Sequence, residues 1–432
     1  MRRVAVVGSG IAGLSVAYGL SDQARVSLFE AGRHFGGHAH TVDVTLDGVT
    51  HGVDTGFLVF NHRTYPQLTR LLSELRVETA PAEMSFSVQA PGLEWSGTDL
   101  NGVFAQRSNL LRPSFLGLLA DLLRFNRLAT ALAERGAEAE LTEPLGEWLD
   151  RHRLGAPFRD GYLLPMLGCI WSCPTAQMLR FPVATMIRFC SNHGLLQLVD
   201  RPQWHTVQGG ARQYVRRMLG RIADARLATP VRGLRRLPPG DGRGGVVLRT
   251  DRGFERFDEV VLACHSDQSL ALLEDATADE SALLGAIRYH PNQAVLHTDA
   301  SLLPRRRRAW AAWNYERAAV GAREDAGVCL HYLINRLQQL PWQSPVLVSL
   351  NPVRAPDPAR VLGRYAYSHP VFDGAAVAAQ RRLPEIQGRS HVWYCGAWTR
   401  YGFHEDGLVS GQSVVDGLRA RWAASGVSLQ AA

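Results

Sequence analysis

The chain has 432 residues, of which 46% are hydrophobic, and its formal charge is +7. The length and the hydrophobic content predict a large core in two or three domains. All 47 basic residues are arginine, which excludes a lysine Schiff base, a lysine general base and a lysine-bound water. The six cysteines are scattered, which indicates a cytoplasmic protein with reduced thiols. No membrane-spanning helix is predicted, because there is no apolar run of roughly 18 residues. No nucleic-acid partner is predicted, because there is no nucleic-acid motif.

The first predicted unit is a strand, a glycine-rich turn and a helix. A continuous apolar run over residues 4–7 is typical of a buried parallel strand, and a G-x-G-x-x-G pattern follows it. These glycines allow a tight turn, a close approach of the backbone to a pyrophosphate, and close packing of helix on strand. A second strand ends at Glu30, at the spacing of a carboxylate that binds an adenosine ribose. The predicted dinucleotide contacts are Gly8, Ser9, Gly10, Ile11, Ala12, Gly13, Glu30, Ala31 and Gly32.

The next stretch, AGRHFGGHAHTV (31–42), adds the glycine pair Gly36 and Gly37 after the ribose-binding acid. With this pair the sequence resembles the flavin amine oxidase and phytoene desaturase superfamily, which carries Glu-x(5)-Gly-Gly-Arg here. The resemblance implies FAD rather than NAD. His38 stands where that family usually has arginine, and it would be a weaker, titratable phosphate partner.

Further cofactor contacts are expected along the chain. VDTGFLVFN (53–61) places Gly56, followed by Phe57, in a turn after a strand, and residues 229–234 and 246–265 are predicted as strands of the same sheet. Ala263, near the end of the last strand, is a cofactor candidate. In the superfamily the residue at Val231 offers its backbone to adenine; the alternative is a simple core position.

The middle of the chain lacks dinucleotide features. Residues 110–134 predict a strongly apolar helix, either a core helix or one whose arginine-bearing face contacts a membrane surface. LPRRRRAWAAW (303–313) sets four arginines beside two tryptophans, which suits a lipid headgroup interface. The alternative is a solvated turn.

The segment 392–422 predicts a strand, a Gly-Ala turn, a loop and then a helix over 407–422. A helix N-terminus stabilises negative charge, and a reduced flavin carries its charge at N1 and O2. The cofactor candidates of this segment are Gly396, Ala397, Asp406, Gly407 and Leu408: the first two leave room for the pyrophosphate or ribityl chain, Asp406 is a helix cap or first-turn acid, and Gly407 allows close approach of the ring.

The predicted catalytic residues are His404, Glu405, Tyr401, Tyr367 and His369, which are expected to flank the flavin ring. The alternative for His404 and Glu405 is a hydrogen-bonded loop that fixes the helix start. No metal site is predicted, because three adjacent residues at 404–406 cannot converge on one ion. Cys395 is expected beside the pyrophosphate rather than the ring, so FAD is predicted to bind non-covalently.

Several segments resemble one family closely: SNHGLLQ and RPQWHTVQGG, WAAWNYE, NRLQQL and VSLNP, SHPVFD, and YGFHEDGL. They are similar to the flavin-binding region ahead of the methyltransferase in plant cyclopropane fatty acid synthases and to stand-alone bacterial proteins of that type. The likeness runs from about residue 3 to 420. It implies an α/β fold with a Rossmann-like, GR2-type FAD-binding domain interleaved with a mixed α+β, amine-oxidase-like substrate domain. The FAD domain takes residues 1–80, 205–268 and 385–425, the substrate domain takes 81–204 and 269–384, and 426–432 form a disordered tail.

Three functions remain open at the level of sequence. The first is an FAD-dependent oxidoreductase of desaturase or oxidase type that acts on an unsaturated or methyl-branched acyl chain, with a fatty acid methyltransferase as partner and peripheral contact with the inner membrane face. The second is a flavin amine oxidase, against which the missing lysine speaks. The third is a non-catalytic lipid-binding protein stabilised by FAD.

Overall fold

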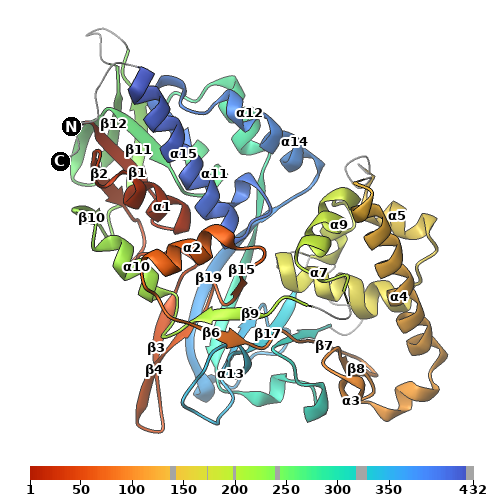
Figure 1. Ribbon diagram of the computed structural model, residues 1–432. Coiled ribbons are helices and arrows are strands. Elements are labelled where there is room, and N and C mark those ends of the chain that lie inside the picture. The colour runs from red at the N-terminus through yellow and green to blue at the C-terminus, as the bar shows by residue number, and fades with distance from the viewer. Residues whose placement is uncertain (137–142, 173, 198–200, 239–243, 318–327, 425–432) are drawn as a thin grey trace.

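The computed structural model describes residues 1–136, 143–172, 174–197, 201–238, 244–317 and 328–424 (Figure 1). The predicted tail, 426–432, lies outside these residues. A five-stranded parallel sheet contains the amino-terminal strand, and its buried valines reflect a sheet covered on both faces. Its strand order is β10 (Asp224–Arg226), β2 (Arg25–Phe29), β1 (Arg3–Val7), β14 (Glu259–Leu262) and β20 (Val392–Tyr394).

Two helices from opposite ends of the chain pack together beside this sheet. In Figure 1, α15 (His404–Ala424) runs alongside α1 (Ile11–Leu20). The Ser15 hydroxyl donates to the Leu408 carbonyl at 3.2 Å, and a Cβ at Gly411 would lie 2.5 Å from the Ala12 carbonyl oxygen. The predicted start of α15 at residue 407 is wrong, because residues 404–406 form its first turn.

The strands predicted after residue 229 do not all join the parallel sheet. β11 (Val231–Arg236), β12 (Val246–Thr250) and β13 (Gly253–Phe257) form a separate antiparallel sheet, whereas β14 pairs with β1. The prediction of one sheet was therefore wrong for β11 and β12. The physical reason is the tight turn after Thr250, which folds β13 back onto β12 before the chain re-enters the parallel sheet.

A seven-stranded sheet lies apart from the parallel sheet. It combines strands near residue 90 with strands after residue 288, and it joins β7 to β16 in parallel and the other neighbours antiparallel. Its order is β19 (Val361–Val371), β15 (Arg288–His297), β18 (Leu347–Leu350), β17 (Cys329–Leu333), β16 (Trp313–Glu316), β7 (Phe86–Ala90) and β8 (Leu93–Ser96). The smaller sheets are the hairpin β3 (Thr41–Leu46) with β4 (Val49–Asp54), and β5 (Phe60–Asn61), β9 (Trp204–Val207) and β6 (Thr79–Ala82).

Helices α4, α5, α7 and α9 gather on the right of Figure 1, away from the parallel sheet. Within the predicted apolar stretch 110–134, Pro113 begins α4, as expected for proline in a first helical turn. Among the described helices, none is long and apolar enough to cross a bilayer. Besides α1 and α15, the described α-helices are α2 (Pro66–Glu74), α3 (Leu100–Val103), α4 (Pro113–Glu134), α5 (Leu145–Arg151), α6 (Ala156–Phe158), α7 (Leu164–Trp171), α8 (Thr175–Met178), α9 (Val183–Asn192), α10 (Arg212–Leu219), α11 (Ser266–Leu272), α12 (Ala278–Gly285), α13 (Ile334–Leu337) and α14 (Gly374–Arg382).

Candidate active site

The glycine-rich turn after β1 forms one end of a large cavity. Gly8 has a φ of +102°, and a Cβ there would lie 2.9 Å from the Ala263 carbonyl oxygen. A Cβ at Gly13 would lie 1.9 Å from the Gly8 carbonyl oxygen, whereas a Cβ at Gly10 would meet nothing within 4 Å. Gly8 and Gly13 therefore serve turn and packing, and Gly10 presents open backbone to the cavity.

The Glu30 carboxylate lines the same end of the cavity. One oxygen accepts hydrogen bonds from the Ser9 amide at 3.0 Å and the Ser9 hydroxyl at 2.6 Å, and the other accepts from the Gly32 amide at 2.7 Å. These bonds fix the carboxylate at the carboxyl end of β2, next to the turn after β1. This is the geometry of an acid that binds a ribose hydroxyl.

His404 faces the cavity from the first turn of α15. Its ring stacks on Phe57 with centroids 3.9 Å apart, and its Nε2 lies 2.6 Å from the Tyr214 hydroxyl. Burial lowers the pKa of His404 to about 3, so the imidazole is neutral at neutral pH. A neutral imidazole in this position can donate one hydrogen bond and accept another, but it carries no charge.

His369 and Tyr367 face the cavity from β19. The Asn292 amide donates to His369 Nδ1 at 3.0 Å, and burial lowers the His369 pKa to about 4. Burial also raises the pKa of Tyr367 to about 12, and its hydroxyl lies 2.8 Å from Thr55 Oγ1. All three ring groups at this part of the cavity are thus neutral at neutral pH.

Glu405 and Tyr401, which were expected to flank the flavin ring, do not line the cavity. The Glu405 carboxylate accepts from the backbone amides of Gln67 at 2.8 Å and Leu68 at 2.9 Å, so it caps the N-terminus of α2 from outside that helix. Tyr401 offers its backbone carbonyl to the Trp171 indole at 3.3 Å.

Other predicted cofactor contacts are likewise placed away from the cavity wall. Asp406 accepts from the Phe403 amide at 3.0 Å, which makes it a first-turn acid of α15 rather than its cap. A Cβ at Gly407 would lie 2.8 Å from the Ile11 side chain, so this glycine serves the contact of α15 with α1. Approach of a flavin ring to Gly407 stays a prediction. The predicted cofactor residues that do not line the cavity are Gly13, Gly32, Asp406, Gly407 and Leu408.

The cavity has a volume of about 1250 Å³, above the roughly 300–1,000 Å³ typical of one small-molecule site. The predicted cofactor residues that line it are Gly8, Ser9, Gly10, Ile11, Ala12, Glu30, Ala31, Gly36, Gly37, His38, Gly56, Phe57, Val231, Ala263, Gly396 and Ala397. Beyond them the cavity continues between the seven-stranded sheet and the helices on the right of Figure 1. It therefore has space for a dinucleotide and for a second molecule.

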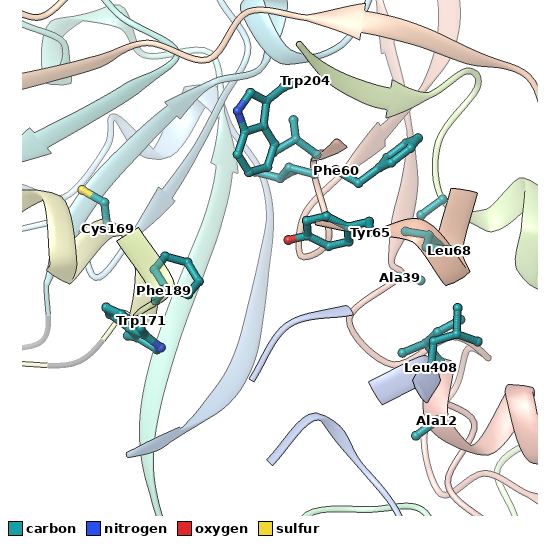
Figure 2. Close-up of a cluster of buried hydrophobic side chains, with 14 of the residues drawn as sticks. Ala12, Ala39, Phe60, Tyr65, Leu68, Cys169, Trp171, Phe189, Trp204 and Leu408 are labelled. Atoms are coloured by element: carbon teal, nitrogen blue, oxygen red, sulfur yellow. The ribbon is translucent and has the colours of Figure 1, made fainter. Parts of the chain in front are cut away.

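The continuation of the cavity, called the apolar arm below, has an apolar and aromatic wall. Its members come from β7, α4, the π-helical turn Arg159–Leu163, α7, α9, β9 and β16–β18. They include Phe86, Leu119, Leu122, Tyr162, Met166, Cys169, Ile170, Phe189, Trp204, Trp313, Tyr332, Val348 and Leu350. Figure 2 shows Cys169 and Phe189 on one side and Tyr65 and Trp204 on the other. The charged side chains among the described lining residues are Glu30 and Arg232 at the nucleotide end and the exposed Arg201.

Comparison with known proteins identifies this arrangement. Residues 11–297 match the family profile of the flavin-containing amine oxidoreductases. The chain belongs to this family. No curated protein matches the sequence of this flavin oxidoreductase.

Solved structures share the fold of this flavin oxidoreductase over almost their whole length. A fatty acid isomerase from P. acnes that produces CLA aligns over 96% of this chain and 98% of its own, with a TM-score of 0.68 and 15% identity. Cyclohexylamine oxidase from Brevibacterium oxydans aligns over 98% and 99%, with a TM-score of 0.68 and 16% identity. Putrescine oxidase bound to putrescine aligns over 97% and 99%, with a TM-score of 0.64 and 15% identity. At such identities the likeness shows the fold alone.

The residues at the nucleotide end fit a flavin cofactor. The N-terminus of α1 has no capping side chain and no acid in its first turn, so its amides can donate hydrogen bonds to a phosphate group. His38 Nε2 is buried and has no hydrogen-bond partner, although buried polar atoms are normally satisfied. Burial also lowers the His38 pKa well below its usual value, so the ring offers a neutral donor or acceptor. The flavin oxidoreductase thus has unsatisfied polar groups where a dinucleotide would bind.

The structure adds cavity residues that the sequence reasoning missed. Cys264 and His265 follow the carboxyl end of β14 and line the cavity beside Tyr289, on whose ring His265 stacks at 4.3 Å. Their position directly after a parallel strand is the signal that could have found them. Cys395 is buried and does not line the cavity.

One further polar cluster lies in the seven-stranded sheet, away from the cavity. His331 Nε2 lies 2.9 Å from Glu316 Oε2 and 3.5 Å from the Cys329 thiol. The Arg354 guanidinium donates to the other Glu316 oxygen at 2.9 Å. Burial alone would raise the pKa of Glu316, but the hydrogen bonds from His331 and Arg354 outweigh it and lower the pKa. The cluster is therefore a partly buried network of ion pairs and hydrogen bonds.

Proposed function

We propose that this chain is an FAD-dependent oxidoreductase that acts on a C–H bond of a lipid acyl chain. The observation that carries the proposal is the apolar arm, which continues from the nucleotide end into the space between the seven-stranded sheet and helices α4, α7 and α9. When bound, FAD supplies the hydride chemistry, accepting a hydride from or donating one to a neighbouring carbon. Such chemistry needs mainly positioning in a dry pocket, and few ionisable groups.

The protein groups in this part of the cavity suit an uncharged substrate. His404, His369 and Tyr367 are all neutral at neutral pH because burial shifts their pKa values away from 7. They can exclude water and orient a chain by contact and by hydrogen bonds. A cationic substrate would need a carboxylate, and the carboxylate among the described lining residues is Glu30, which lies at the nucleotide end rather than in the apolar arm.

The proposed substrate class is an unsaturated or methyl-branched acyl chain of a phospholipid, with a fatty acid methyltransferase as the partner that supplies or consumes it. This class comes from the resemblance to the region fused to plant cyclopropane fatty acid synthases. A fatty acid isomerase of the same fold is a further support, because an acyl chain fits that fold. FAD is proposed to bind non-covalently: Cys395 lies outside the cavity wall, and burial raises the pKa of the two thiols on it, Cys169 and Cys264, so they stay protonated.

Amine oxidation is the second candidate, because two solved structures with this fold are amine oxidases. Against it stand the absence of lysine from the sequence and the apolar arm. The two candidates differ in the molecule that reduces the bound cofactor, and this difference can be measured directly.

The deciding experiment is an anaerobic titration of the purified yellow protein, followed by its flavin absorbance. Phospholipids with unsaturated or methyl-branched chains are added first, glycerophosphate serves as a headgroup control, and putrescine and cyclohexylamine follow. Bleaching by the lipids and not by glycerophosphate is the expected result. Bleaching by amines alone would overturn the proposal in favour of amine oxidation. No bleaching by any donor, with FAD still bound, would favour an isomerase without net flavin reduction or a non-catalytic lipid-binding protein.

A further inference from the structure

Exposed leucines concentrate on one short segment of the chain. Of the eleven large hydrophobic residues that are exposed in the described structure, five lie between residues 100 and 123, and the others are scattered from Met1 to Leu362. Leu111 is 88% exposed, Leu100 77% and Leu123 50%. The five residues, called the leucine face below, are Leu100, Leu110, Leu111, Leu116 and Leu123. Single exposed leucines are ordinary, but a concentration of them marks an interaction surface.

The leucine face follows consecutive elements. Leu100 begins α3, Leu110 and Leu111 end the 3-10 turn Arg107–Leu111, and Leu116 and Leu123 lie on α4. The last two are seven residues apart and so share one side of the helix. In Figure 1, α3 and α4 lie on the side of the molecule remote from the parallel sheet.

Positive charge surrounds the leucine face. The segment 97–128 contains four arginines and two aspartates. The short 3-10 turn Arg307–Ala309 packs against α3 and β8, which brings the exposed arginines 305–308 to the same region from a distant part of the sequence. Arg306 pairs with Glu94 at 2.6 Å, and Arg307 lies over the Trp310 ring at 5.4 Å. A rim of arginines beside tryptophan is complementary to anionic headgroups.

The leucine face is also the mouth of the apolar arm. Leu100 and Leu123 are exposed and at the same time line the cavity. Val103, Phe104, Leu119 and Leu122 continue the wall inward from them. Apolar surface is thus continuous from the outside of the molecule to the cavity interior, and a chain that enters here does not cross water.

We propose that the leucine face docks on a bilayer with anionic headgroups and that acyl chains enter the apolar arm directly from that bilayer. The leucines reach the acyl region, and the surrounding arginines contact lipid phosphates. The passage of a substrate chain rests on the proposed function, whereas the docking itself needs no turnover.

The test is co-sedimentation of the FAD-bound protein with vesicles of phosphatidylglycerol, compared with vesicles of phosphatidylcholine. We expect binding to phosphatidylglycerol vesicles that weakens as salt is raised, because salt screens the arginines. Leu111→Ser should weaken this binding by about tenfold, the effect of withdrawing one leucine from an apolar phase. Phe254→Ser is the matched control, since Phe254 is 73% exposed on β13 and lies outside the leucine face.

A second pair of variants tests the charge. Arg305→Glu with Arg308→Glu should abolish the preference for phosphatidylglycerol, whereas Arg25→Glu with Arg381→Glu, two exposed arginines elsewhere, should preserve it. Failure of the wild-type protein to bind phosphatidylglycerol vesicles at low salt would overturn the proposal, and so would equal losses in Leu111→Ser and Phe254→Ser.

Failure of membrane docking and failure of the proposed function give different experimental results. A water-soluble short-chain phospholipid should bleach the flavin of Leu111→Ser as fast as that of the wild type, because Leu111 does not line the cavity. If vesicles bind but no lipid bleaches the flavin, the docking stands and the proposed chemistry fails. If lipids bleach the flavin without vesicle binding, the chemistry stands and the docking fails.

Discussion

His404 lies between the nucleotide end of the cavity and the apolar arm, and Phe57 and Tyr214 hold its ring in place. Its replacement by alanine should slow reduction of the flavin by substrate about 10–100-fold, because a positioned neutral group is lost, while FAD remains bound. Since its pKa is about 3, the wild-type rate should show no titration of this group between pH 5 and 9. Anaerobic stopped-flow absorbance measures both quantities. Loss of the yellow colour in His404→Ala would instead assign the residue to the structure.

His38 offers a second prediction at the scale of one residue. Its Nε2 is the buried polar atom left without a partner at the nucleotide end, and a bound cofactor would satisfy it. His38→Ala should weaken FAD binding about 3–10-fold, which corresponds to one neutral hydrogen bond. Fluorescence titration of apoprotein with FAD gives the affinity, with His62→Ala as a control outside the cavity wall. Equal affinities of the His38 variant and the wild type would place this ring away from the cofactor.

Asp406 provides a testable dependence of stability on pH. Burial raises its pKa to about 6, against an ordinary value of 3.8, even though the Phe403 amide partly stabilises the charge. Because the pKa is higher in the folded than in the unfolded state, the protonated carboxyl contributes to the free energy of unfolding. This contribution is complete below about pH 4 and is lost as the pH rises through 6. The difference in free energy of unfolding between Asp406→Asn and the wild type should therefore grow in favour of the variant from pH 4 to pH 7. Urea unfolding measures it, and a constant difference would contradict the assignment.

At the scale of elements, α2 depends on a residue far away in the chain. Its own N-cap, Tyr65, makes no side-chain cap, and its first turn has no acid, so the Glu405 carboxylate satisfies two of its amides. Glu405→Ala should lower the free energy of unfolding by about 1 kcal/mol, the usual value of a cap. Glu405→Gln should lose less, because it keeps an acceptor. Flavin reduction per bound FAD should stay unchanged in both, and a slower reduction would return Glu405 to the catalytic candidates.

The elements also show where reasoning from sequence succeeds. The turn Gly8–Gly13 and its acid Glu30 were predictable, because local spacing alone determines a strand, a turn and a helix. The capping of α2 by Glu405 was not predictable, because its partners lie 337 and 338 residues away and no local sequence pattern reports such a contact. The apolar arm was missed for the same reason: β7 pairs with β16 across more than 200 residues, and only that pairing brings Phe86 beside Trp313.

At the scale of the whole molecule, the cavity lies between the parallel sheet and the seven-stranded sheet, so a bound cofactor contacts elements from both layers. A ligand that binds only the folded state, and whose free concentration is about 100 times its dissociation constant, adds about 2.7 kcal/mol to the free energy of unfolding. For 432 residues this corresponds to a rise in Tm of about 3 °C. Removal of FAD should therefore lower Tm by that amount, and readdition should restore it.

Differential scanning calorimetry of apo and reconstituted protein measures the shift in Tm, and His38→Ala should show a smaller shift at the same FAD concentration. An identical Tm with and without FAD would mean that the two layers do not need the cofactor between them.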